Sequence, residues 1–165
     1  MVDPQATYQK IIQILTDNKA DYKLFNHKPA LTYDDLLEVQ KDTGFFGTEG
    51  KCMVIRVNEH FIVYITTRGK KLDFHNIQNV LQSKAVRLAN PDELKESFGA
   101  EPGCAYPFGF DKSISIFIDP NVYNQDWFLF SPVLSTSTIQ VKGSDLKRVF
   151  ASLPNRITET SQFNS

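Results

Sequence analysis

Apolar side chains recur at helical spacing in several segments of the chain. In residues 5–18, Tyr8, Ile11, Ile12 and Leu15 would lie on one face of a helix, which is the pattern of an amphipathic helix that covers a core. Further helices are predicted at residues 33–41, 74–82, 91–98 and 145–153, each preceded by a residue that can cap its first turn: Thr32, Asp73, Asn90 and Ser144. The pattern therefore predicts four or five helices.

Runs of β-branched and aromatic residues indicate about seven short strands. The runs "KCMVIRV" and "HFIVYITT" are separated only by Asn58 and Glu59, which is typical of a hairpin. The other candidate strands lie at residues 21–28, 85–89, 114–119, 127–131 and 137–141. Because helices and strands do not alternate regularly, we expect an α+β fold.

One loop breaks the usual rule that connections are polar. The stretch "GAEPGCAYPFGF", residues 99–110, combines three glycines and two prolines with a tyrosine and two phenylalanines. The glycines and prolines exclude a helix. Taken alone, the stretch predicts a stiff turn between a helix and a strand, with aromatic side chains that fill the core.

Composition and charge bound the class of protein. The 165 residues are 41% hydrophobic and 22% charged, as in an ordinary globular protein. We expect a single domain over residues 1–153, followed by a polar and loose tail over residues 154–165. The net charge of −1 argues against a protein that coats DNA or RNA through a general positive field. It leaves open a local basic patch.

The start of the chain and its apolar runs bear on location. The first residues, "MVDPQATYQ", lack the basic and apolar segments of a signal peptide. The longest apolar runs, such as "FIVYI", are too short to span a bilayer. We therefore expect a cytoplasmic protein with reduced cysteines, a monomer or small oligomer that binds neither membranes nor DNA.

The sequence offers little conventional catalytic machinery. It has no nucleophile elbow, phosphate-binding glycine loop or dinucleotide-binding fingerprint. Its three histidines and two cysteines lack zinc-ligand spacing, so no metal or cofactor is expected. Cys52 and Cys104 could serve as nucleophiles of a thiol hydrolase, but small buried residues beside strands are the commoner role for such cysteines.

Four motifs, taken in order, resemble the YbaK/ProX family of free-standing aminoacyl-tRNA editing domains, which is related to the insertion domain of bacterial prolyl-tRNA synthetase. The resemblance covers residues 22–150 and is most specific at Lys51, which opens a strand, and at the Gly-x-x-x-Pro loop from Gly103 to Pro107. It implies a mixed, mostly antiparallel, curved sheet of about seven strands with flanking helices. The motifs are "FNHKPALT", "KCMVIRVNEHFIVYITTRGKKLDFHNI", "ANPDELKESFGAEPGCAYPFGF" and "FSPVLSTSTIQVKGSDLKRVF".

The resemblance also implies an activity. Members hydrolyse the ester of a mischarged tRNA, commonly tRNA for proline that carries a small amino acid such as Ala, Ser, Thr or Cys. A second site is needed because a synthetase pocket rejects a smaller amino acid by only about 1–3 kcal/mol. Water attack assisted by the substrate's own ribose hydroxyl would fit a sequence without a nucleophile, base and metal set. Prolyl-tRNA synthetase or an elongation factor is a possible partner.

The resemblance carries over to particular residues of this chain. The catalytic group would comprise Lys51, Gly103 and Pro107, with backbone N–H groups of the loop holding the ester oxygen. The substrate-binding group would comprise Thr32, Cys52, Cys104, Ala105, Tyr106, Phe108, Ser131 and Ser135. The basic cluster Arg68, Lys70 and Lys71 would bind tRNA phosphates, with Lys147 and Arg148 as the alternative cluster.

Two motifs depart from the family pattern. Cys52 stands where the alanine-specific branch commonly has Asn, and Ser131 and Ser135 stand where it has His and Asn. The serines are either adapted contacts or a polar turn before a strand. The departures support a second hypothesis, in which the chain is a weakly active or inactive member that binds tRNA or a synthetase as a module.

Overall fold

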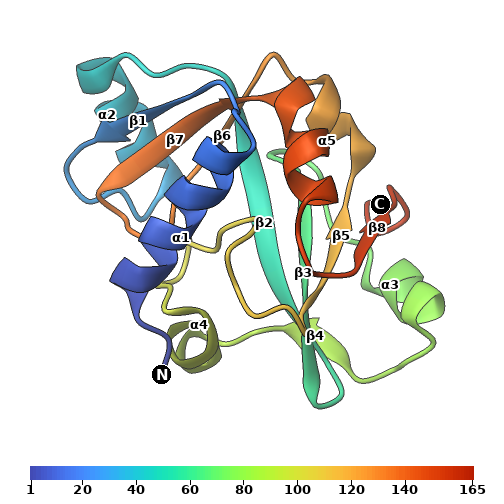
Figure 1. Ribbon diagram of the computed structural model, residues 1–165. Coiled ribbons are helices and arrows are strands. Elements are labelled where there is room, and N and C mark those ends of the chain that lie inside the picture. The colour runs from blue at the N-terminus through green and yellow to red at the C-terminus, as the bar shows by residue number, and fades with distance from the viewer.

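The computed structural model describes all 165 residues of the chain (Figure 1). Eight strands form one sheet in the order β1-β7-β6-β2-β3-β5-β8, and β4 pairs with β2 off this path. The strands are β1 (Tyr22–Asn26), β2 (Thr48–Val57), β3 (His60–Thr67), β4 (Val86–Leu88), β5 (Ser115–Ile118), β6 (Trp127–Phe130), β7 (Ser137–Lys142) and β8 (Ile157–Glu159).

The sheet is mixed. The pairs β1–β7, β6–β7, β2–β3 and β2–β4 are antiparallel, whereas β2–β6, β3–β5 and β5–β8 are parallel. The α+β class and the mixed, mostly antiparallel sheet are therefore confirmed. The long strand β2 joins the two halves of the sheet, because its first residues pair with β6 and the rest of it pairs with β3.

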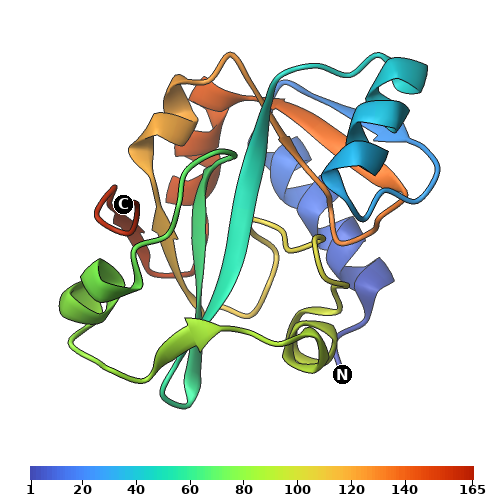
Figure 2. The same cartoon turned by 180° about the vertical axis from the view of Figure 1, so that it is seen from behind.

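Five α-helices and one 3-10 helix surround the sheet. They are α1 (Pro4–Asp17), α2 (Tyr33–Thr43), α3 (Phe74–Leu81), α4 (Pro91–Phe98), α5 (Gly143–Ala151) and the 3-10 helix η1 (Pro120–Asn124). Helices α1 and α5 lie in front of the sheet in Figure 1 and behind it in Figure 2. None of these helices has both the length and the apolar character that crossing a membrane requires.

The core has three clusters: a large one on one face of β2 and β3, a smaller one on the opposite face, and a third of Val39, Phe45 and Leu129 beneath α2. The large cluster joins Ile11 and Leu15 of α1 with Leu146 and Phe150 of α5, and also contains the aromatic residues of the 99–110 loop. The smaller cluster contains Met53, Ile55, Ile62, Tyr64, Ile77 and Phe163.

The expectation of a loose tail is wrong. Residues 157–159 form β8, the eighth strand, and Phe163 is fully buried between Tyr64 and Phe117, with ring centroids 5.0 Å from each. The tail is largely polar in composition, and Phe163 is its one aromatic residue. Burial of this ring removes apolar surface from water and holds the tail against the sheet.

Helix caps were predicted correctly with one exception. Thr32, Asp73 and Asn90 each accept a backbone N–H in the first turn of their helix. Ser144 is not a cap, because α5 begins at Gly143 and its N-cap, Lys142, makes no side-chain capping bond. A Cβ at Gly143 would collide with the carbonyl oxygen of Gln125, so close packing against the η1 segment fixes where this helix begins.

Candidate functional site

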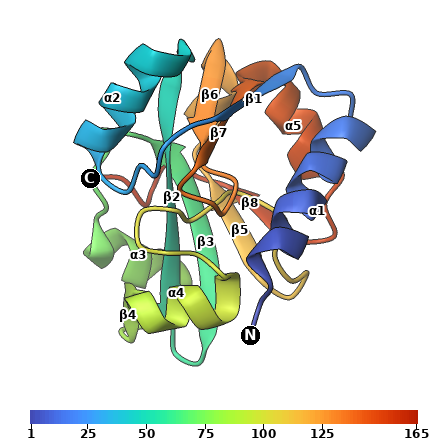
Figure 3. The same ribbon diagram turned by 90° about the vertical axis from the view of Figure 1, so that its left-hand side faces the viewer.

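The loop after α4 faces β2 (Figure 3). A pocket of about 400 Å³ is lined by residues of both. Its origin is a gap in the sheet: on one edge of β2, β6 pairs only at residues 48–49 and β4 only at residues 55–57. Residues 49–54 line the pocket, together with parts of α2, α4, the 102–105 loop and the segment around Ser131. The unpaired edge therefore forms one wall, and loops form the other.

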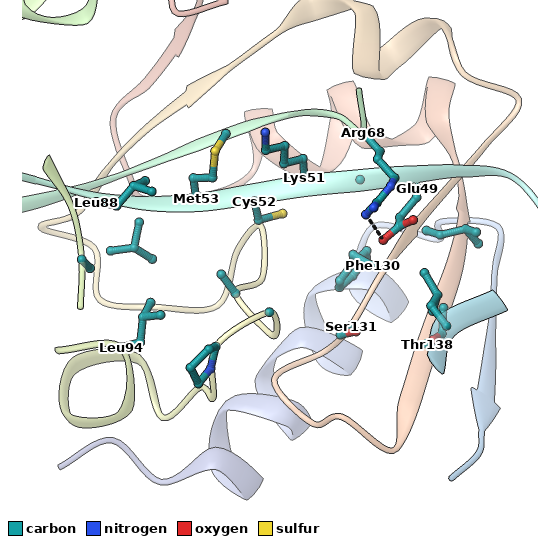
Figure 4. Close-up of a pocket in the computed structure, with 18 of the residues that line it drawn as sticks. Glu49, Lys51, Cys52, Met53, Arg68, Leu88, Leu94, Phe130, Ser131 and Thr138 are labelled. Carbon is teal, nitrogen blue, oxygen red and sulfur yellow. Dashed lines mark hydrogen bonds and ion pairs between the residues drawn. The ribbon is translucent and has the colours of Figure 1, made fainter. Parts of the chain in front are cut away.

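The alternation of side chains along β2 decides which of them enters the pocket. Figure 4 shows the Cys52 side chain pointing toward the side of Leu94 and Ser131, whereas Lys51 and Met53 point to the other side of the strand. A Cβ at Gly50 would collide with the ring of Phe128, so glycine is required there. Cys52 is thus the side chain that β2 offers to a ligand.

Lys51 lies beside the pocket without pointing into it. Its Nζ donates a 2.9 Å hydrogen bond to the carbonyl oxygen of Lys70. The bond ties β2 to the connection after β3, which carries Arg68. Lys51 is among the residues that border the pocket, but its ammonium group bonds to the connection after β3.

An ion pair stands at the α2 side of the pocket. The Arg68 guanidinium lies 3.4 Å from a carboxylate oxygen of Glu49 and 3.5 Å from the ring centroid of Tyr33 at the start of α2. Burial raises the pKa of Glu49, and Arg68 partly opposes that rise. Arg68 is about half exposed, so an anionic group can reach it. Lys70 and Lys71 are exposed and do not line the pocket.

The 99–110 loop supplies backbone to the opposite wall. Gly103 has φ +87°, and a Cβ there would lie 3.0 Å from the carbonyl oxygen of Leu31, so both conformation and space favour glycine. The N–H of Cys104 donates to the carbonyl oxygen of Glu101, whereas the N–H groups of Gly103 and Ala105 donate to no acceptor of the chain. Two residues with free backbone donors therefore line the pocket.

The aromatic residues of this loop are core residues, and the interpretation of Tyr106 and Phe108 as pocket walls is wrong. The Tyr106 hydroxyl donates 2.7 Å to the carbonyl oxygen of Phe98. Phe108 packs edge-on against Phe130 and Phe150. Pro107 is also buried and Cys104 is completely so, and neither lines the pocket.

Three hydroxyl residues were expected near the substrate, and only one lines the pocket. Ser131 borders it, but Ser135 does not; its carbonyl oxygen accepts the N–H of Ala30. Thr32 is occupied with its capping box, in which it accepts the N–H of Asp35. The carboxylate of Asp35 accepts the N–H of Leu31 and the N–H of Thr32, and these two hydrogen bonds lower its pKa.

A fourth hydroxyl group, that of Thr138, was missed. Thr138 lines the pocket and lies 2.8 Å from Nε2 of His27, whose Nδ1 lies 2.7 Å from the carbonyl oxygen of Lys28. A carbonyl accepts only, so Nδ1 carries a proton, and in the neutral ring Nε2 accepts from Thr138. Thr138 pairs with Phe25 in the β1–β7 register, which brings it close to His27. The sequence alone does not give this register.

The thiols are unsuited to nucleophilic catalysis. Burial raises the pKa of Cys52 to about 12 and that of Cys104 to about 11, so both are protonated at neutral pH and lack thiolate character. The structure contains no cluster of three or more His, Cys, Asp or Glu that could hold a metal ion. The polar groups that line the pocket include Ser131, Thr138 and the Glu49–Arg68 ion pair.

The chain is similar in sequence to proteins of one known family. The family model described as "Aminoacyl-tRNA editing domain" matches residues 27–149. The "Multifunctional Ser/Thr-tRNA deacylase ProXp-y" of Escherichia coli K12 is 22% identical over 155 residues, covering 90% of this chain and 91% of that protein. The "Prolyl-tRNA editing protein ProX" of Acetoanaerobium sticklandii is 19% identical over 146 residues, covering 86% and 88%.

A longer relative matches in part. The "Proline--tRNA ligase" of Bacillus licheniformis is 30% identical over 69 residues, which is 42% of this chain and 12% of the ligase. The chain thus spans a small fraction of that enzyme.

A solved structure described as a candidate trans-editing enzyme for prolyl tRNA synthetase superposes with a TM-score of 0.69 at 13% identity, covering 96% of this chain and 98% of the other. At this identity the likeness shows that the two proteins share a fold.

Proposed function

The chain belongs to the aminoacyl-tRNA editing domain family, and we propose that it hydrolyses the ester between a wrongly attached amino acid and the 3′ end of its tRNA. The observation that carries the proposal is the pocket beside the gap in β2, with two free backbone donors on its opposite wall. An ester carbonyl placed between them would receive hydrogen bonds as negative charge develops on its oxygen.

The attacking group in this proposal is water. Cys52 and Cys104 hold their protons at neutral pH, and Glu49, the carboxylate of the pocket, is paired with Arg68. We propose that the ribose hydroxyl next to the ester positions the water and assists the departure of the tRNA. Single-turnover deacylation of a tRNA whose terminal ribose lacks that hydroxyl is expected to be slower by two orders of magnitude or so. An unchanged rate would contradict this mechanism.

The substrate of this proposal is tRNA for proline that carries a small amino acid: Ala, Ser, Thr or Cys. The hydroxyls of Ser131 and Thr138 border the pocket, and buried polar groups favour ligands that complete their hydrogen bonds. Among the four, they favour Ser and Thr. The name of the E. coli relative, a Ser/Thr-tRNA deacylase, points the same way.

Roles for the cations follow from their positions. We propose that Arg68, half exposed at the pocket, binds the phosphate of the terminal nucleotide, with Lys70 and Lys71 as weaker contacts along the same connection. Lys51 is a positioning residue in this proposal, because its hydrogen bond holds the connection that carries Arg68.

The test is a deacylation panel. Purified protein would be offered tRNA for proline charged with Ala, Ser, Thr, Cys or Pro, and release of the amino acid would be followed over time. The proposal expects hydrolysis of Ser- or Thr-charged tRNA and none of Pro-charged tRNA. Binding of all five without hydrolysis of any would favour a tRNA-binding module. Repeating the panel with prolyl-tRNA synthetase or elongation factor present tests whether either partner raises the rate.

A further inference from the structure

A second cleft begins on the far side of Glu49 and Arg68. These two residues line the editing pocket and also a hollow beside α2, and that hollow in turn shares Gly47 and Thr48 with a cleft of about 700 Å³. The cleft is lined by the segments that precede β2 and surround β6, and by the start of α5. The shared residues place the three hollows next to one another.

Phe46 is the most exposed aromatic side chain of the cleft, with 57% of its surface accessible. Its backbone is nevertheless fixed. The Phe46 N–H donates 2.9 Å to Oε1 of Gln140, which is 1% exposed. At Gly47 a Cβ would lie 2.7 Å from the carbonyl oxygen of Trp127, so the chain here packs closely on β6. The side chain of Phe46 is therefore exposed to solvent, while its backbone is held in place.

The ring of Phe46 is also oriented. Trp127 meets it edge-on, with centroids 6.4 Å apart and an interplanar angle of 75°. An edge-on contact of this kind fixes the ring plane and leaves a face of Phe46 free. A flat aromatic ligand can stack on that face at little cost in side-chain entropy, because the ring is already held in place.

Among the polar side chains of the cleft, Thr48 and Gln125 bond to each other, whereas four others are unpartnered. Asn124, Asp126, Lys142 and Ser144 line the cleft, and none of their side chains forms a hydrogen bond or ion pair within the chain. Amides and carboxylates recognise base edges by hydrogen bonding, with carboxylates accepting from the amino group of cytosine. A lysine provides a point charge for a phosphate. The combination fits a nucleotide better than an apolar peptide.

We propose that this cleft binds the unpaired nucleotides that precede the terminal adenosine of the tRNA, with one base stacked on Phe46. The inference rests on the proposed function. Asp126 and Asn124 pair with the edge of that base, and Lys142 lies near its phosphate. Phe46 is three residues from Glu49, at most about 10 Å along an extended chain, so the nucleotides next to the one in the pocket are those within reach.

The single tryptophan gives a direct test, because Trp127 is the only one in the chain and lies in this cleft. A trinucleotide RNA of sequence CCA, and then uncharged tRNA, would be titrated while tryptophan fluorescence is recorded. Both ligands are expected to change the signal. Phe46→Ala and Phe46→Leu should each weaken binding about 10-fold, whereas Phe46→Tyr should retain it.

Two further variants set the specificity of this test. Val80→Ala removes an exposed apolar side chain of α3, which does not line the cleft, and is expected to leave binding unchanged. Lys142→Ala should lower the salt dependence of tRNA binding by about one counterion. No fluorescence change with either RNA, or equal affinity of wild type and Phe46→Ala, would overturn the inference.

Kinetics separate this inference from the proposed function. Phe46→Ala should raise the KM for aminoacyl-tRNA about 10-fold and leave hydrolysis of aminoacyl-adenosine unchanged, because that small ester lacks the preceding nucleotides. Hydrolysis of both substrates with no effect of Phe46→Ala would overturn the cleft alone. RNA binding that depends on Phe46 without hydrolysis of any substrate would overturn the proposed function alone.

Discussion

The two faces of β2 carry different kinds of residue. Toward the pocket the strand presents Gly50, which has no side chain, and Cys52, which has a small, half-buried thiol; Val54 follows on the same face and is buried in the large cluster. Toward the opposite face it presents Met53 and Ile55, which are buried in the smaller cluster with Phe163 of the tail. The first face leaves space for a ligand, and the second joins the sheet to the end of the chain.

This difference separates function from stability within one strand. Small residues on the pocket face leave room that a larger side chain would fill, so substitutions there should act on the substrate. Large residues on the opposite face contribute through buried area, so substitutions there should act on the free energy of unfolding. If the two faces are independent, a substitution on one face should leave unchanged the property that depends on the other.

The largest effect is expected on the buried face. Phe163→Ala should lower the free energy of unfolding by about 3–5 kcal/mol, because the ring is fully buried between Tyr64 and Phe117. Urea unfolding measures this loss. Deacylation per folded molecule should stay close to wild type. A large fall in kcat at a temperature where the variant is still folded would show that the tail acts on the pocket.

The pocket face should show the reverse pattern. Cys52→Leu places a larger side chain in the space that receives the aminoacyl group, and should lower kcat/KM at least about 100-fold, which corresponds to about 2.7 kcal/mol. Stability should change by less than about 1.5 kcal/mol, because the added carbons extend into the pocket. Ile55→Val, which removes one methyl group from the opposite face, is the matched control.

The control and a thiol variant complete that test. Ile55→Val should cost about 1 kcal/mol of stability and leave kcat/KM unchanged. Cys52→Ala should retain hydrolysis with altered preference among amino acids, since the thiol holds its proton. Complete loss of activity in Cys52→Ala, together with a burst of product in wild type, would indicate covalent catalysis instead.

Lys51 joins the two faces, and a smaller effect is expected there. Lys51→Ala removes the hydrogen bond to Lys70 and should raise the KM for aminoacyl-tRNA about 10-fold through misplacement of Arg68. The kcat should change little. In an Arg68→Ala background the same substitution should add almost nothing, because both act on one contact. A fall in kcat with KM unchanged would instead place Lys51 on the reacting atoms.

The sequence could reveal which elements form but not what borders the pocket. Periodicity located the helices and seven of the eight strands, because each carries its own pattern. The pocket depends on long-range pairing: β6 and β4 meet one edge of β2 at its two ends and leave the middle free. No local pattern encodes that gap, and so Thr138 and Glu49 were missed.

The 99–110 loop shows the same limit in a single segment. Its composition suggested both a core turn and a pocket wall, and the structure divides it between the two. Gly103 and Ala105 line the pocket, whereas Tyr106 and Phe108 are core residues. Which residues of an apolar loop face inward depends on the surfaces that surround it, here α1, α4 and β6, and these are unknown until the fold is known.

The smallest effect is expected at the Glu49–Arg68 ion pair, which borders both the editing pocket and the hollow beside α2. Burial raises the pKa of Glu49 above its ordinary value of 4.5, so the folded protein holds this proton at pH values where the unfolded chain has lost it. Stability should therefore fall as pH rises from about 4.5 through the raised pKa. Glu49→Gln should remove that part of the dependence of stability on pH, which thermal unfolding across this pH range measures.

At neutral pH, Glu49→Gln should also release Arg68 for the tRNA phosphate and lower KM about two- to threefold. A higher KM would mean that Glu49 orients Arg68 toward the substrate, and that the pair acts as one unit at the pocket.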